Sequence, residues 1–239
     1  MISMTDLAQN FAQVRSNIEA AAQRAHRDPQ DIKLIAVSKT VSCETVLLAM
    51  NEGQMLFGEN RVPEIEKKQQ GCPGANFHLI GTLQTNKVNK VVGKVELIHS
   101  VDTLHLLEAI NKRAANLGVT QHVLLQVNVA GEESKHGFTP QEMPAVLDAI
   151  KSMQGVFVNG LMTMAPHTDA DKVRWVFRDL RNLCGSLQKY ADEQGIAQVQ
   201  LNELSMGMSN DYEIAVEEGA TYVRVGTSLF GPRDYRDKQ

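Results

Sequence analysis

The chain has 239 residues, with 24 lysines and arginines against 28 aspartates and glutamates, and a formal net charge of −4. That balance creates no basic field for nucleic acid, and no apolar run reaches the roughly 18 residues of a membrane span. We therefore expect neither a nucleic-acid nor a membrane partner. The length suits one large α/β domain over residues 1–239.

The cysteines and the N-terminus indicate a cellular compartment. Cys43, Cys72 and Cys184 are widely spaced and form no CxxC or zinc-binding pattern. Three such cysteines suit a reducing cytoplasm. The first thirteen residues include Asp6 and lack the apolar core of a secretory signal peptide. The sequence therefore predicts a cytoplasmic protein with no metal site.

The N-terminal segment predicts an amphipathic helix. Leu7, Phe11, Val14 and Ile18 recur at intervals of four, three and four residues, so they form one apolar stripe on a helix that runs to about His26. Because this helix precedes the first strand, we expect it to pack outside the sheet or to cap one of its ends.

Short apolar runs and helical patterns alternate through the rest of the chain. The predicted strands are 33–38, 54–58, 76–80, 95–101, 122–129, 157–163, 200–205 and 221–225. The predicted helices between them are 43–51, 61–69, 85–92, 103–116, 140–152, 170–194 and 210–218. Several of these helices are followed by a glycine, which is typical of a helix end.

Eight strands that alternate with helices predict a parallel sheet with crossover connections. Eight strands also close a (β/α)₈ barrel, and the chain length fits one. The alternative is an open doubly wound sheet, which carries a glycine-rich loop after its first strand. Here the first strand leads into Lys39 and Thr40 with no glycine nearby. We predict a single (β/α)₈ TIM barrel with an extra N-terminal helix.

Lys39 places an amine at the end of the first predicted strand, directly after an apolar run. Burial lowers the pKa of a lysine and frees its amine to attack carbonyl carbons. The commoner arrangement is a lysine whose stem packs at the strand end while its ammonium group reaches water. Lys39 alone does not establish the reactive alternative.

Two loops near the C-terminus together predict an anion site. In (β/α)₈ barrels, a phosphate often lies in the loops after strands seven and eight, near a helix N-terminus. After strand seven, Gly207 allows a tight turn, and Ser209 or Asn210 can cap the next helix. After strand eight, Gly226 and Thr227 offer backbone amides and a hydroxyl group. Two ordinary loops are the alternative, but their position on adjacent strands favours an anion.

Strand alternation turns Arg224 toward the barrel interior if Val223 and Val225 pack against the helices. A buried guanidinium group needs a partner. That partner is either a carboxylate such as Glu203 or an acceptor on a bound ligand, and the sequence leaves both open.

Several longer stretches carry a family resemblance. They are AVSKT at 36–40, FGEN at 57–60, FHLIGTLQTNK at 77–87, SKHGF at 134–138, GLMTM at 160–164, LSMGMS at 204–209, VRVGT at 223–227 and FG at 230–231. In these stretches the chain closely resembles the pyridoxal-phosphate homeostasis proteins, which are related to the N-terminal barrel domain of alanine racemase. The similarity runs from the first helix to Tyr235, and Leu79 replaces the usual Phe or Met with another apolar side chain.

The resemblance implies a set of cofactor contacts. Lys39 would form a Schiff base, the internal aldimine, with pyridoxal 5′-phosphate (PLP), and Arg224 would face the pyridine nitrogen. Ser209, Gly226 and Thr227 would hold the phosphate.

Further residues would line the pocket or its mouth. The resemblance places Asn60 near the ring hydroxyl, and Ser205, Met206 and Gly207 along the pocket wall. His78 and Lys135 would lie near the mouth. The simpler interpretations are a strand histidine with satisfied hydrogen bonds and a solvated loop lysine.

The same residues argue against strong catalysis. Arginine has only donors and stays charged, so Arg224 can hydrogen-bond only an unprotonated pyridine nitrogen, which leaves the ring a weaker electron sink. Racemisation also needs proton transfer on both faces of the substrate carbon. In alanine racemases, a tyrosine from a second domain of a partner subunit supplies the opposing base, and we expect no counterpart of that domain here.

The leading prediction is a PLP carrier or buffer in intracellular PLP homeostasis. It would be a monomer or weak dimer that passes PLP to apoenzymes without robust catalysis. One alternative is a low-activity PLP-dependent amino-acid racemase, in which Lys135 or His78 supplies the second base. Another alternative is a lysine aldolase with a phosphorylated sugar in the two loops.

Overall fold

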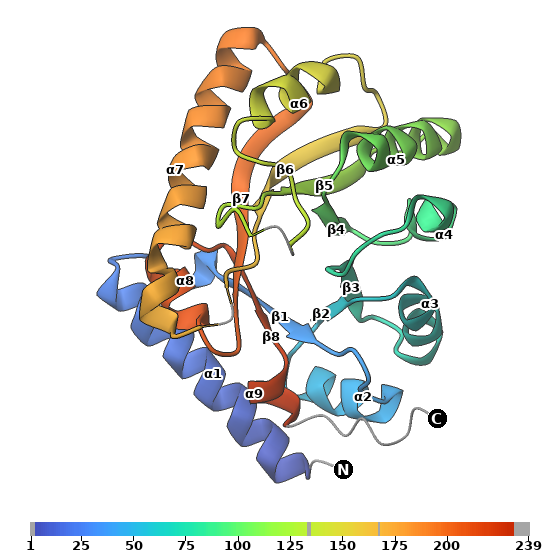
Figure 1. Ribbon diagram of the computed structural model, residues 1–239. Helices are drawn as coiled ribbons and strands as arrows, with labels where there is room; N and C mark the ends of the chain where they lie inside the picture. The colour runs from blue at the N-terminus through green and yellow to red at the C-terminus, as the bar shows by residue number, and fades with distance from the viewer. Residues whose placement is uncertain (1–2, 133–134, 167, 232–239) are drawn as a thin grey trace.

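The computed structural model describes residues 3–132, 135–166 and 168–231. In these ranges eight parallel strands close into a barrel in chain order (Figure 1). The strands are β1 Lys33–Val37, β2 Leu56–Glu59, β3 Asn76–Leu79, β4 Leu97–Val101, β5 Gln121–Gln126, β6 Val156–Met162, β7 Val199–Met208 and β8 Tyr222–Val225. The predicted (β/α)₈ barrel is confirmed.

Helices connect consecutive strands and cover the outside of the barrel. They are α2 Cys43–Asn51, α3 Val62–Gly71, α4 Val88–Val91, α5 Leu104–Leu117, α6 Met143–Ile150, α7 Ala170–Gln194 and α8 Tyr212–Glu217, with the short α9 Thr227–Phe230 after β8. Two 3₁₀ turns, Pro29–Asp31 and Thr85–Lys87, precede β1 and α4. In the described part of the chain, no helix combines the length and apolarity that a bilayer crossing requires.

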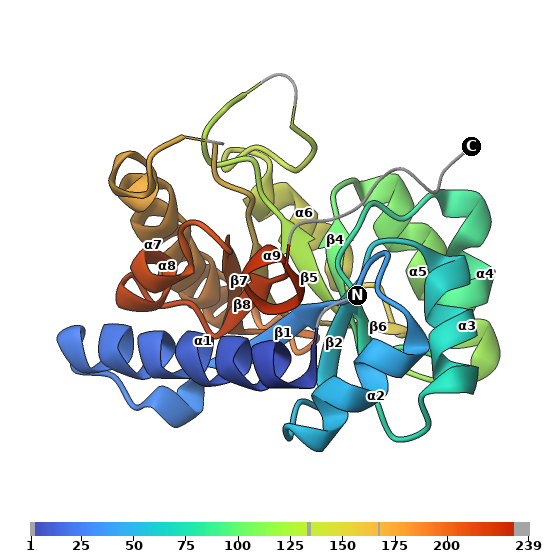
Figure 2. The same cartoon turned by 90° about the horizontal axis from the view of Figure 1, so that it is seen from below.

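The predicted N-terminal helix is α1, Met4–Arg24, and it lies outside the ring along α8 and α9 (Figure 2). Ser3 caps it, because the Ser3 hydroxyl group accepts the backbone N–H of Asp6. The apolar stripe is buried as predicted. Phe11 meets the ring edge of Phe230 at a centroid distance of 6.1 Å, which joins the start of the chain to α9.

The end of β7 differs from the prediction in a way that affects the site. β7 continues to Met208, three residues beyond its predicted end, and α8 therefore begins only at Tyr212. Ser209 and Asn210 lie before the helix, so the predicted cap is wrong. Asp211 is the N-cap residue, but its carboxylate accepts the backbone N–H of Met208 at 2.6 Å rather than a helix amide.

Strand alternation divides the side chains into two shells. The outward shell packs against the helices and forms the main core, which includes Val223 and Val225. The inward shell is a separate cluster that fills the barrel, as in other (β/α)₈ folds. Its apolar members are Ile35, Leu97, Leu124, Met162 and Tyr222.

Two histidines lie in the same interior, packed edge-on against Tyr222. His78 Nδ1 lies 3.0 Å from His99 Nε2, so one ring nitrogen must donate and the other must accept. Burial lowers the pKa of His78 to about 4 and the pKa of His99 well below its usual value. Both rings are therefore neutral at neutral pH.

This neutral pair predicts that the protein loses stability in mild acid. Histidines in the unfolded chain have a pKa near 6.5. Because the folded pKa is lower, the unfolded state binds more protons below about pH 6.5, and the free energy of unfolding should fall as the pH drops from there toward about 4. Urea unfolding across this range measures the slope.

Carboxylates also titrate in part of that range, so variants isolate the histidine contribution. His99→Gln removes one buried histidine and should flatten the slope. His105→Gln removes an exposed histidine of α5 and is the matched control. A His99→Gln slope equal to that of the wild type would contradict the expectation.

Candidate functional site

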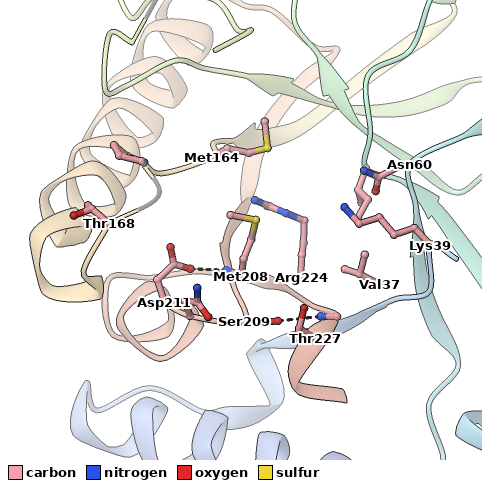
Figure 3. A pocket seen from close by; sticks show the side chains of 14 residues that line it. Val37, Lys39, Asn60, Met164, Thr168, Met208, Ser209, Asp211, Arg224 and Thr227 are labelled. Atoms are coloured by element: carbon pink, nitrogen blue, oxygen red, sulfur yellow. Dashed lines mark hydrogen bonds between the residues drawn. The ribbon is translucent and has the colours of Figure 1, made fainter. Parts of the chain in front are cut away.

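A cavity of about 420 Å³ opens at the carboxyl ends of the strands, where (β/α)₈ proteins place their active sites (Figure 3). Six of its lining residues were predicted from the sequence: Lys39, Asn60, Ser209, Arg224, Gly226 and Thr227. The other lining residues are Val37, Ile80, Met164, Pro166, Thr168, Met208, Asn210 and Asp211. The structure thus brings most of the predicted set to one place.

Lys39 lies in the turn just beyond β1 and reaches into this cavity. Val37 faces inward and lines the cavity, so alternation turns Ser38 outward and Lys39 inward. Thr40 follows with φ of 67°, a left-handed conformation that is uncommon for a β-branched residue and that turns the chain sharply toward α2. Figure 3 shows the half-buried Lys39 side chain with its amine directed toward the side that Arg224 occupies.

Arg224 is 5% exposed and is held by neutral groups. Its Nη1 donates to Ser205 Oγ at 2.6 Å, and its Nη2 donates to the Thr163 carbonyl oxygen at 2.9 Å. Glu203 is not its partner, because this residue lies lower on β7 and pairs with Lys33 at 2.8 Å. The predicted pairing with Glu203 is therefore wrong, and these hydrogen bonds of Arg224 go to neutral groups. Burial lowers the pKa of Arg224 to about 10, with the charge of Asp211 acting in the opposite direction, so the guanidinium group stays charged at neutral pH.

A hydrogen-bonded chain extends below Arg224 through the barrel. Because Arg224 can only donate, Ser205 Oγ accepts from it, and the same oxygen lies 2.8 Å from His99 Nδ1. His99 Nε2 in turn lies 3.0 Å from His78 Nδ1, so the tautomers of the two rings are linked. His78 Nε2 points to the opposite end of the barrel, where it lies 3.9 Å from the Glu96 carboxylate. His78 is 1% exposed, so its implied position near the mouth is wrong.

The two predicted loops meet at one wall of the cavity. The Ser209 hydroxyl group accepts the backbone N–H of Gly226 at 3.2 Å, which ties the end of β7 to the end of β8. Thr227 is the first residue of α9, so its amide lies at a helix start, where N–H groups have no acceptor within the helix. Hydroxyl and amide donors thus gather on this wall.

Met206 and Gly207 do not line the cavity, contrary to what the resemblance implies. Alternation along β7 turns Ser205 inward and Met206 outward, where it is fully buried in the main core. Gly207 has φ of 90°, and a Cβ there would lie 2.5 Å from Ala215 Cβ. Only glycine fits this position of β7, because the backbone has a left-handed φ and α8 approaches closely.

Lys135 lies beside the rim. Its amine donates to the carbonyl oxygens of Ala165 at 2.6 Å and Met164 at 3.3 Å, and it pairs with Glu132 at 3.2 Å. Because Met164 lines the cavity, Lys135 fastens the loop after β6 at the cavity wall. The N-terminal neighbour of Lys135 in the quoted motif, Ser134, lies outside the described residues.

Sequence reasoning missed the part of the site that follows β6. Met164, Pro166 and Thr168 lie beyond the end of this strand, and the barrel rule places such loops at the active end. These residue types carry no chemical signature of their own, so only that positional rule could have found them. Among the described residues, no group of three His, Cys, Asp or Glu side chains is arranged to hold a metal ion.

Comparisons with known proteins agree with this fold. The model of the alanine racemase N-terminal domain family matches residues 9–234. The pyridoxal phosphate homeostasis protein of Aquifex aeolicus is 43% identical over 230 residues, which cover 95% of this chain and 98% of that protein. The protein of the same name from Escherichia coli K12 is 36% identical over 243 residues, with 98% and 100% covered.

Solved structures give the same picture. PipY of Synechococcus elongatus, solved with PLP bound, superposes with a TM-score of 0.80 at 37% identity and covers 94% of this chain and all of its own. Alanine racemase of Clostridium difficile has a TM-score of 0.70 at 17% identity, covers 98% of this chain and 57% of its own, and shares the fold alone. The chain therefore belongs to the alanine racemase N-terminal domain family and, within it, to the pyridoxal phosphate homeostasis proteins.

Proposed function

We propose that the protein binds PLP reversibly, as a Schiff base on Lys39, and serves PLP homeostasis in the cytoplasm. The observation that carries the proposal is the meeting of Lys39 and Arg224 in one cavity whose wall also holds Ser209, Gly226 and Thr227. The relatives named for PLP homeostasis and the PLP-bound PipY structure support it.

The cavity residues match the three functional groups of PLP. When bound, PLP supplies an aldehyde that exchanges amines and a conjugated ring that can accept electrons. The Lys39 amine can attack the aldehyde carbon; a C=N bond forms and water leaves, without oxidation or reduction. Arg224 donates to the ring nitrogen, and the donors of Ser209 and Thr227 suit the phosphate.

The fixed Arg224 favours binding over carbanion chemistry. Its guanidinium group stays charged and has no acceptor, so a ring nitrogen facing it must be unprotonated. Its hydrogen bonds to Ser205 and Thr163 fix the position of the guanidinium group in the cavity. An unprotonated ring withdraws electrons weakly, whereas Schiff-base exchange does not depend on strong withdrawal.

The described side chains named as possible second bases are not placed for that role. Tyr190, Tyr212 and Tyr222 do not line the cavity, and the Asp211 carboxylate, which does, accepts the backbone N–H of Met208. His78 is buried on the far side of Arg224, and the Lys135 amine is occupied by two carbonyl groups. None of these groups is placed to move a proton at the Cα of a bound amino acid, which supports a carrier over a racemase.

Lys39→Ala should abolish the visible absorption that PLP gives as a protein Schiff base, because the variant lacks the amine that forms it. The spectrum of purified protein loaded with PLP, recorded before and after borohydride, measures this. Lys33→Ala is the matched control, since its amine lies at the opposite end of the same strand. An unchanged band in Lys39→Ala would disprove the assignment, and wild-type protein that takes up no PLP would favour the aldolase.

We expect no exchange of the Cα proton of alanine for deuterium at an enzyme-like rate when the PLP-loaded protein is incubated in D₂O. The reason is that His78 is buried below Arg224 and the Lys135 amine is held by two carbonyl oxygens, so neither is placed to act as the second base. Proton NMR of the amino acid follows the exchange. Rapid exchange that disappears in Lys135→Ala or His78→Gln would instead establish the racemase alternative.

A further inference from the structure

A second buried lysine lies behind the wall of the cavity. Lys68 of α3 is 1% exposed, and its amine donates to Glu59 Oε1 and to the Ser38 carbonyl oxygen, each at 2.5 Å. The Ser38 hydroxyl group also donates to Glu59 Oε1, at 2.6 Å. Ser38 and Glu59 are fully buried, so the three residues form a closed polar cluster within the apolar layer between barrel and helix.

The cluster joins the ends of two adjacent strands that carry site residues. Ser38 lies between the end of β1 and Lys39, and Glu59 is the last residue of β2, directly before Asn60. Alternation turns Ser38 and Glu59 outward, toward Lys68, and turns Lys39 and Asn60 inward, where both line the cavity. The cluster therefore lies on the helix side of the barrel wall and holds the backbone at Ser38 and Glu59. These two residues directly precede the side chains that face a ligand, Lys39 and Asn60.

Stability alone does not account for such a cluster. A buried ion pair costs so much desolvation that apolar residues of similar volume often stabilise a fold equally well. Glu59 Oε2 adds to that cost, because it is buried and has no hydrogen-bond partner. Neighbours in the same layer, such as Ile65 of α3 and Phe57 of β2, show that apolar packing is available there. An ion pair adds direction, which apolar packing lacks, since the hydrogen bonds of Lys68 fix the positions of one carbonyl oxygen and one carboxylate oxygen.

We propose that Lys68 and Glu59 are positioning residues for PLP: they hold the carboxyl ends of β1 and β2 so that the Lys39 amine and Asn60 face the same ligand. This inference rests on the proposed PLP binding. Neither residue touches the ligand, and both act through the backbone of their neighbours.

The test replaces both charges at once, because removal of only one would leave the other buried and unpaired. Lys68→Met combined with Glu59→Leu should keep the fold and its urea midpoint close to wild type. The dissociation constant for PLP should rise by about tenfold, because Lys39 and Asn60 would no longer be held facing the same ligand; this corresponds to about 1.4 kcal/mol of binding free energy. The visible band of the bound PLP should also change at a different pH, because the surroundings of the Schiff base on Lys39 would differ. A cluster that only stabilises the fold would leave this pH midpoint unchanged.

Two control variants distinguish a loss of PLP positioning from a general loss of stability. Lys67→Met removes the exposed lysine beside Lys68 on α3 and should change neither quantity. Gln121→Met removes a buried polar side chain at the amino end of the barrel, where it bonds the Val95 carbonyl oxygen, and should lower stability without changing the dissociation constant.

The outcomes distinguish this inference from the function on which it rests. Wild-type protein that forms no Schiff base would defeat the proposed function itself. Wild-type PLP binding together with an unchanged dissociation constant and pH midpoint in the double variant would overturn the positioning role alone. If the double variant does not fold, Lys68→Arg decides by the same two measurements, since it keeps both charges and changes only the geometry of the donors.

Discussion

Closure of the barrel between β1 and β8 is the constraint on which the site depends. Ile35 of β1 pairs in register with Arg224 of β8, so the first and last strands become neighbours. Lys39, at the end of β1, and Arg224 therefore reach into one cavity although they lie at opposite ends of the chain. An open sheet of the same strands would leave these two residues at separate edges.

The electrostatics of the cavity follow from how Arg224 is buried. Its charge is held by the Ser205 hydroxyl group and the Thr163 carbonyl group, neither of which neutralises it. The cavity consequently keeps a positive guanidinium group beside the hydroxyl and amide donors of Ser209 and Thr227, an arrangement suited to an anionic ligand. The Lys68–Glu59 cluster differs, because its opposite charges offset each other and add little to the electrostatic potential of the cavity. Its contribution is to hold the ends of two strands in place.

Much of this arrangement could be predicted from the sequence, because strands, helices and barrel ends leave periodic signals. The apolar pattern predicts all eight strands, the strand ends and alternation indicate Lys39 and Arg224, and the barrel rule indicates the two anion-binding loops. The sequence prediction fails where tertiary contacts override the local pattern. β7 runs on past its predicted end through Gly207, whose left-handed backbone lies where the pairing with β8 shifts register, and the helix cap is displaced accordingly. His78 lies in the predicted strand, but its pairing with His99 depends on a neighbouring strand that no local pattern specifies.

The direct test of the account is the location of the covalent bond. PLP-loaded protein is reduced with borohydride and digested, and the peptides are weighed and sequenced by mass spectrometry. The account predicts that the added mass of the reduced cofactor lies on the peptide that contains Lys39 and on that residue. Label on Lys68 or Lys135 in place of Lys39, or on no lysine, would contradict it.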